Sequence, residues 1–206
     1  MPRLVELRRR APEGSAPWAF ASVELAERTV SFDPWRASAL AHGVTRVCPE
    51  DHRAWGLLGL AQSLLGHHRF AIHAYHQALD LRPNNPWYAH NLGHLYDIAL
   101  DEPETAIPWL TRAREGLAAM PASRGLDLDK ARREVAASLA HALLGVGQAS
   151  QAREVMREVM TGGPGPAHHE LYREILARED AALDAMDRPD GRPRRQPRKR
   201  RYTRSS

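Results

Sequence analysis

Two histidines and an aspartate with the spacing H-x3-H-x2-D form the most chemically suggestive group in the sequence. They are His90, His94 and Asp97, and residues three and four apart share one face of a helix. Imidazole nitrogens and a carboxylate on one face are ligands that zinc accepts, with His141 as a candidate fourth ligand. The Glu of a metalloprotease H-E-x-x-H motif is missing here. The pattern favours histidines that contact a peptide or respond to pH, and we predict no metal and no cofactor.

The other residues that often carry catalysis are poorly placed for it. Cys48 is the only cysteine and precedes Pro49 at a predicted helix C-terminus, where the helix dipole does not activate a thiol. The Gly-rich stretch from Gly162 to Gly165 is interrupted by proline and is not followed by Lys-Ser/Thr, as a phosphate-binding loop requires. We therefore expect no enzymatic activity.

A strongly basic segment ends the chain. Residues 188–206 contain nine Arg or Lys residues and a single acidic residue, Asp190, while the rest of the chain is mildly acidic. The segment has almost nothing apolar to bury, so we predict a disordered tail. Two interpretations stay open: the tail neutralises phosphates of a nucleic acid or an anionic surface, or it only solubilises the protein. The candidate polyanion-binding residues are Arg192, Arg194, Arg195, Arg198, Lys199, Arg200, Arg201 and Arg204.

The elements that position these groups are indicated by the stretch from Trp55 to Pro83. Trp55, Leu58 and Gly59 are followed by Gln62, and then by Gly66, Ala71, Tyr75, Ala78 and Pro83. This order resembles the tetratricopeptide repeat (TPR), a helix-turn-helix unit of about 34 residues with the pattern W-x2-L-G-x2-Y, A-x3-F and P. Gln62 stands where that pattern has Tyr. The resemblance implies an all-α fold of antiparallel helical hairpins stacked as a short superhelix.

The same period can be laid along most of the chain. Asp33-Pro34 and Asn85-Pro86 are typical helix starts. In the third unit Ala106, Leu110 and Ala113 come one residue late, which predicts an extra residue in the turn near Asp101 to Pro103. The predicted organisation is a flexible lead-in over 1–17, an array over 18–166 with units 18–51, 52–85, 86–120 and 133–166, a capping helix over 167–187 and the basic tail over 188–206.

In TPR proteins the first helices of successive repeats line a concave groove that holds a peptide or a partner helix. Carried onto this chain, Trp87 is the candidate hot spot, although a core position between repeats explains it equally well. The groove lacks the Lys, Asn and Arg set that clamps the carboxylate end of chaperones, because Gly56, Leu60, Glu134 and Ser138 occupy most of those positions. The predicted partner-binding residues are Arg53, Leu57, Leu60, Leu64, Trp87, His90, Asn91, His94, Asp97 and His141.

Composition agrees with a water-soluble interaction module. The chain of 206 residues is 43% hydrophobic and 26% charged, and no apolar run approaches the roughly 18 residues that span a bilayer. A single cysteine suits the reducing cytoplasm. We therefore predict a cytoplasmic, non-catalytic adaptor that binds a peptide or partner helix in the groove. The alternatives are an adaptor that the tail anchors to nucleic acid and, third, a chaperone for a secreted substrate.

Overall fold

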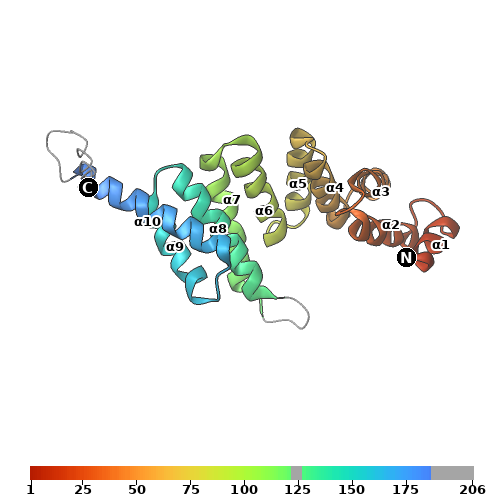
Figure 1. The fold of residues 1–206 in the computed structure, drawn as a ribbon. Helices are drawn as coiled ribbons and strands as arrows, with labels where there is room; N and C mark the ends of the chain where they lie inside the picture. Colours follow the sequence, from red (N-terminus) through yellow and green to blue (C-terminus); the bar gives the residue numbers. More distant parts are fainter. Residues whose placement is uncertain (122–126, 187–206) are drawn as a thin grey trace, which may run out of the picture.

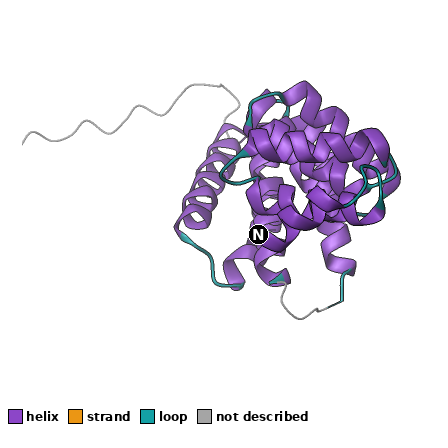
Figure 2. Cartoon of the chain, turned by 90° about the vertical axis from the view of Figure 1, so that its right-hand side faces the viewer, coloured by secondary structure: helices purple, strands orange, loops and turns teal. Residues whose placement is uncertain are grey.

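A computed structural model of the protein describes residues 1–121 and 127–186. This part of the chain is helical and contains no β-strand (Figures 1 and 2). Its elements, in chain order, are α1 (Pro2–Arg10), α2 (Ala16–Thr29), α3 (Pro34–Val47), α4 (His52–Leu64), α5 (His68–Leu81), α6 (Pro86–His94), the π-helical turn η1 (Leu95–Ala99), α7 (Pro103–Ala119), α8 (Leu128–Gly145), α9 (Ala149–Thr161) and α10 (Pro166–Met186).

The helices are stacked as hairpins along one direction. The pairs α2/α3, α4/α5, α6/α7 and α8/α9 each pack against the next pair, and the first helices α2 and α4 also touch. Figure 1 shows the row running from α1 at one end to α10 at the other. The predicted all-α superhelix of helical hairpins is confirmed. No helix in the described ranges is both long enough and apolar enough to cross a membrane.

Short polar side chains begin four of these helices. Asp33 accepts a hydrogen bond from the backbone N–H of Arg36, and Asp51 accepts two from the start of α4. Asn85 caps α6 in the same way, and Asp127 caps α8. Each cap satisfies backbone donors that have no partner within the first turn. The helix starts that the sequence predicts at Asp33-Pro34 and Asn85-Pro86 are present.

Small residues let the two helices of a hairpin approach closely. A Cβ atom on Gly59 would lie 2.8 Å from ring carbons of the buried Tyr75, and one on Gly93 would lie 2.7 Å from Leu110. Ala71 and Ala78 on the facing helix are fully buried. These contacts explain why the repeat pattern needs Gly and Ala at fixed spacing, since a larger side chain would separate the helices.

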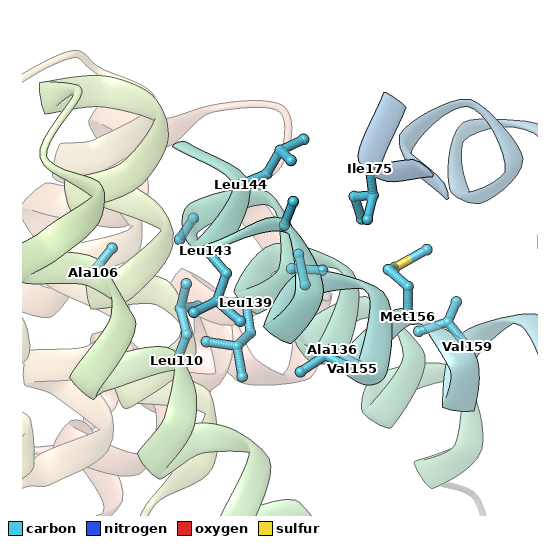
Figure 3. Packing of buried hydrophobic residues seen from close by; sticks show 14 residues of the cluster. Ala106, Leu110, Ala136, Leu139, Leu143, Leu144, Val155, Met156, Val159 and Ile175 are labelled. Carbon is cyan, nitrogen blue, oxygen red and sulfur yellow. The ribbon is translucent and has the colours of Figure 1, made fainter. Parts of the chain in front are cut away.

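The C-terminal half is closed by α10. Ile175 is fully buried and packs with Met156 and Val159 of α9, in a cluster that continues through α8 to Ala106 and Leu110 of α7 (Figure 3). Without α10 the apolar side of the last hairpin would face water. The helix therefore caps the array.

The third unit contains its extra residue in a helix rather than in a turn. The π-helical turn η1 directly continues α6, and the backbone N–H of Glu102 donates to the carbonyl of Tyr96 (2.8 Å). A π-helical turn holds one more residue than an α-helical turn. The one-residue delay at Ala106 is thus real, but its predicted position near Asp101 to Pro103 is wrong.

The N-terminal lead-in also differs from expectation. Residues 2–10 form helix α1, which packs against α2, whereas the breaker-rich sequence after it led us to predict a flexible segment over 1–17. Leu4 lies against the cluster of α2 to α5, and the Arg8 guanidinium sits over the Trp18 ring at 5.5 Å from its centroid.

The start of the fourth unit also differs from the prediction. Helix α8 begins at Leu128, five residues before residue 133, where this unit was predicted to start.

Candidate partner-binding face

Polar side chains from α6, η1 and α8 meet on the first-helix side of the third and fourth units. His90 Nε2 lies 3.2 Å from Ser138 Oγ, and His141 Nδ1 lies 2.7 Å from Asp97 Oδ2. The rings of His90 and His94 are 6.1 Å apart between centroids. The two polar contacts to α8 join residues that are 48 and 44 positions apart in the sequence. Four predicted site residues, His90, His94, Asp97 and His141, are therefore brought into one cluster.

The pair of Asp97 and His141 has one buried and one accessible member. The Asp97 side chain is 3% exposed, whereas that of His141 is 52% exposed. The hydrogen bond from His141 Nδ1–H to the carboxylate raises the pKa of His141, although partial burial opposes it. Because Nδ1 is occupied by Asp97, Nε2 is the ring nitrogen left for a ligand. Asp97 is buried and cannot contact a partner, so the structure corrects its predicted role to one of holding His141.

The pKa of His90 is shifted in the opposite direction. Burial, and then the neighbouring His94, lower the pKa of His90 to about 4, so the imidazole is neutral near pH 7. Ser138 Oγ donates to the carbonyl of Glu134 (3.1 Å), and it therefore accepts from His90 Nε2–H. The cluster thus combines a neutral histidine with one that is biased towards the charged form.

These hydrogen bonds also bear on metal binding. In the described ranges, no group of three or more His, Cys, Asp or Glu side chains is arranged to hold a metal ion. Within the H-x3-H-x2-D set, Nε2 of His90 faces Ser138, and Asp97 faces His141. The residues that suggested ligands for one ion instead form two hydrogen-bonded pairs, one between α6 and α8 and one between η1 and α8.

The predicted residues of α4 divide into anchored and accessible ones. Arg53 pairs with Glu24 (2.9 Å) and Glu27 (2.7 Å) of α2, which raises its pKa. Leu57 and Leu60 are half-buried against the cores of the first and second units. Leu64 is 56% exposed and is the accessible apolar side chain among them.

Trp87 and Asn91 are half-buried on α6. Trp87 packs against the cluster of α5 to α8, and it lines a cavity of about 510 Å³ together with His52, Arg82 and Met120. Burial raises the pKa of the Tyr75 hydroxyl, and the side chain of Asn91 opposes that shift. Trp87 therefore has a core contact and also lines a cavity, and its role as a binding hot spot stays a prediction.

Comparison with known proteins identifies the repeat. The family model described as tetratricopeptide repeat matches residues 52–85. Residues 52–85 therefore form a tetratricopeptide repeat. A comparison with curated proteins found no match.

Solved structures share the fold of this chain at low sequence identity. MamA (41-end) from Desulfovibrio magneticus RS-1 has a TM-score of 0.66 at 19% identity, covering 82% of this chain and 89% of its own. PilF of Pseudomonas aeruginosa has a TM-score of 0.66 at 18% identity, covering 82% and 72%. YrrB, described as a TPR protein with an unusual peptide-binding site, has a TM-score of 0.59 at 20% identity, covering 81% and 85%. At these identities the likeness concerns the fold alone.

Sequence reasoning missed some contacts of the TPR array. Tyr88 covers Gly56 and its hydroxyl lies 2.8 Å from His52 Nδ1, so a groove position that we expected at Gly56 is filled. The signal was available, because a glycine in the middle of a helix often marks close approach of a bulky neighbour. The candidate polyanion-binding residues between Arg192 and Arg204 lie outside the described residues.

Proposed function

We propose that this TPR protein is a non-catalytic scaffold that binds a peptide or helix of a partner protein across the face that carries His94 and His141. The observation that carries the proposal is the hydrogen bond between buried Asp97 and half-exposed His141. A buried carboxylate that accepts from one imidazole nitrogen fixes that nitrogen and leaves the other free to contact a partner. Binding modules use such fixed donors to set the orientation of a partner.

The proposed contact is a charge-assisted hydrogen bond. With its pKa raised by Asp97, His141 donates from Nε2–H to a carbonyl or carboxylate of the partner. His94 lies exposed one turn beyond His90 and supplies a second imidazole. Neutral His90 keeps Ser138 in place without adding charge to the cluster.

Apolar anchoring in this proposal comes from α4 and α6. Leu64 and the accessible edge of Trp87 are the anchors, while Leu57 and Leu60 extend the apolar surface between units. Full burial of one such anchor contributes roughly 1.5–3 kcal/mol. Two or three anchors with one charged hydrogen bond therefore support about micromolar affinity after the cost of association.

Affinity purification with the full chain tests the proposal. His94→Gln and His141→Gln together remove the two accessible imidazoles without enlarging the core. His169→Gln, at an exposed histidine on α10, is the matched control. We expect the double variant to lose the partners that the wild type and the control retain, with unchanged far-UV circular dichroism. Retention of the same partners by the double variant would contradict the proposal.

The same purification separates the two alternative functions. An adaptor that the tail holds on nucleic acid should lose its partners after nuclease treatment. A chaperone should capture an exported substrate, and loss of the histidine contacts should release it.

A further inference from the structure

A second cavity lies on the side of α4 that faces away from the groove leucines. Its volume is about 610 Å³, within the range of ligand-binding pockets, and α3, α4 and α5 line it. Trp55, Leu58 and Gln62 recur every three to four residues and share one face of α4, whereas Leu57, Leu60 and Leu64 share another. Its lining includes Trp35, Arg46, Trp55, Gln62, His67 and Phe70.

The cavity is associated with the one departure of the second unit from the repeat pattern. The pattern places Tyr at the position of Gln62, and the third unit keeps it as Tyr96. Tyr96 packs against both the α7–α10 core and the α5–α8 core. Gln62 instead lines the cavity, because its side chain is smaller and polar. At the matching sequence position the third unit thus has a tyrosine packed against the core, whereas the second unit has a polar side chain that lines a cavity.

The Gln62 side chain is a polar part of the cavity lining, and two hydrogen bonds hold it in place. Its Nε2 donates to Ser38 Oγ (2.7 Å), so its Oε1 is the acceptor that faces His67 Nδ1 at 2.7 Å. His67 must then carry its proton on Nδ1, which leaves Nε2 to contact a ligand. The chain of Ser38, Gln62 and His67 links α3, α4 and the start of α5.

Large aromatic side chains form the rim. Trp35 is 66% exposed and Phe70 is 70% exposed, and both rings make edge-to-face contacts with His67, at centroid distances of 5.6 and 6.5 Å. Trp55 is oriented by its indole N–H, which donates to the carbonyl of Pro49 (2.7 Å), and it packs edge-on against His73. Aromatic side chains held in this way present apolar surface at little cost in side-chain entropy.

The charge of the lining indicates the kind of ligand. Arg46 and the three imidazoles of His42, His67 and His73 line the cavity, and no carboxylate does among the residues described there. We propose that this cavity binds an acidic peptide segment of a partner protein, with an aromatic or large aliphatic side chain inserted between Trp35 and Phe70. Carboxylates beside that side chain then accept hydrogen bonds from Arg46 and from an imidazole N–H of His42 or His73.

The chain's own basic tail does not suit this site. The tail has the same sign of charge as Arg46, and it follows α10, which lies at the opposite end of the row from α3 (Figure 1). The tail of a second copy carries the same charge and is disfavoured for the same reason. The partner is therefore a different, acidic chain.

A random peptide library displayed on phage, panned against the immobilised full chain, tests this proposal. We expect the enriched sequences to place Asp or Glu beside Trp, Phe or Leu. A synthetic peptide with the consensus is then titrated by fluorescence polarisation against the wild type and three variants. Phe70→Ala removes an exposed rim contact, Gln62→Tyr places a larger aromatic side chain in the cavity, and Arg46→Gln removes the charge.

Each variant should weaken binding by about tenfold or more, which corresponds to about 1.4 kcal/mol. The pair His94→Gln and His141→Gln should leave it unchanged, so failure of this proposal and failure of the proposed function are distinguishable. A basic consensus, the absence of a consensus, or equal affinity for Phe70→Ala would overturn the proposal. If Gln62→Tyr does not fold, the Phe70 and Arg46 variants alone decide.

Discussion

Acid should destabilise the protein through His90, and the size of this effect follows from its position. The folded-state pKa of about 4 lies below the ordinary value of 6.5, because burial disfavours the imidazolium. A depressed pKa gives stability that is present above the unfolded-state value and is lost as pH falls towards the folded-state value. At pH 5 the unfolded chain holds the proton almost completely while the folded chain largely excludes it. Through His90, acidification from about pH 7.5 to about pH 5 therefore lowers the free energy of unfolding by at most about 2 kcal/mol.

The variant that isolates this effect is His90→Gln. The Gln side-chain amide can still donate to Ser138 Oγ, as His90 Nε2 does, but it does not titrate. Urea unfolding followed by far-UV circular dichroism at several pH values gives the free energy of unfolding of each protein. We expect the wild type to lose about 2 kcal/mol more than His90→Gln on acidification. Burial also lowers the pKa of His52, but His52 is present in both proteins, so its effect cancels in the difference between them.

His141 should change the pH dependence of stability in the opposite direction to His90. The pKa of His141 is raised by Asp97, so its contribution is fully present below the unfolded-state pKa and is lost as pH rises through the folded-state value. His141→Gln should therefore make the acid-induced loss larger, whereas His90→Gln makes it smaller. Equal acid sensitivity of the wild type and His90→Gln would show that burial of His90 is not what sets its protonation.

Two further predictions concern packing and the tail. Gly59→Ala should lower the free energy of unfolding by about 1–3 kcal/mol, because the new methyl group meets the buried Tyr75 ring at 2.8 Å. Gly43→Ala, whose new Cβ would lie at an ordinary 3.6 Å from Trp18, should instead stabilise by about 0.5–1 kcal/mol in the same urea measurements. Any affinity for DNA should fall steeply with added salt and disappear when the chain is truncated at Arg188, as measured by fluorescence anisotropy. Equal DNA binding by the truncated protein would exclude the tail as the binding element.

The repeat architecture was predictable because close packing imposes it on the sequence. Gly59, Ala71 and Ala78 are required where two helices touch, and this requirement leaves a period that can be counted. Asp33 and Asn85 were equally informative, since a helix start needs side-chain acceptors for its free N–H groups. Helix α1 was not predicted because its sequence contains few apolar residues, and Leu4 is its contact with the main core.

The details of the candidate site were less predictable. The late spacing of Ala106 revealed an extra residue, but a longer turn and a π-helical turn produce the same delay in the sequence. The choice matters for Asp97, because an extra residue within the helix changes the direction of every side chain after it. In a regular α-helix Asp97 would lie on the same face as His90 and His94. Within η1 it is buried and reaches His141 instead.

Both proposed sites arise where the chain departs from its own repeat. Positions that match the repeat pattern are used for packing, as Tyr75, Leu92 and Leu110 show by their burial, and they are not available to a partner. The extra residue in η1 frees a carboxylate to hold His141, and Gln62 in place of Tyr opens the cavity beneath Trp35 and Phe70. Departures of this kind reduce the packing density, and with it the stability, of the unit that contains them. We therefore expect them to persist where binding a partner offsets the lost stability.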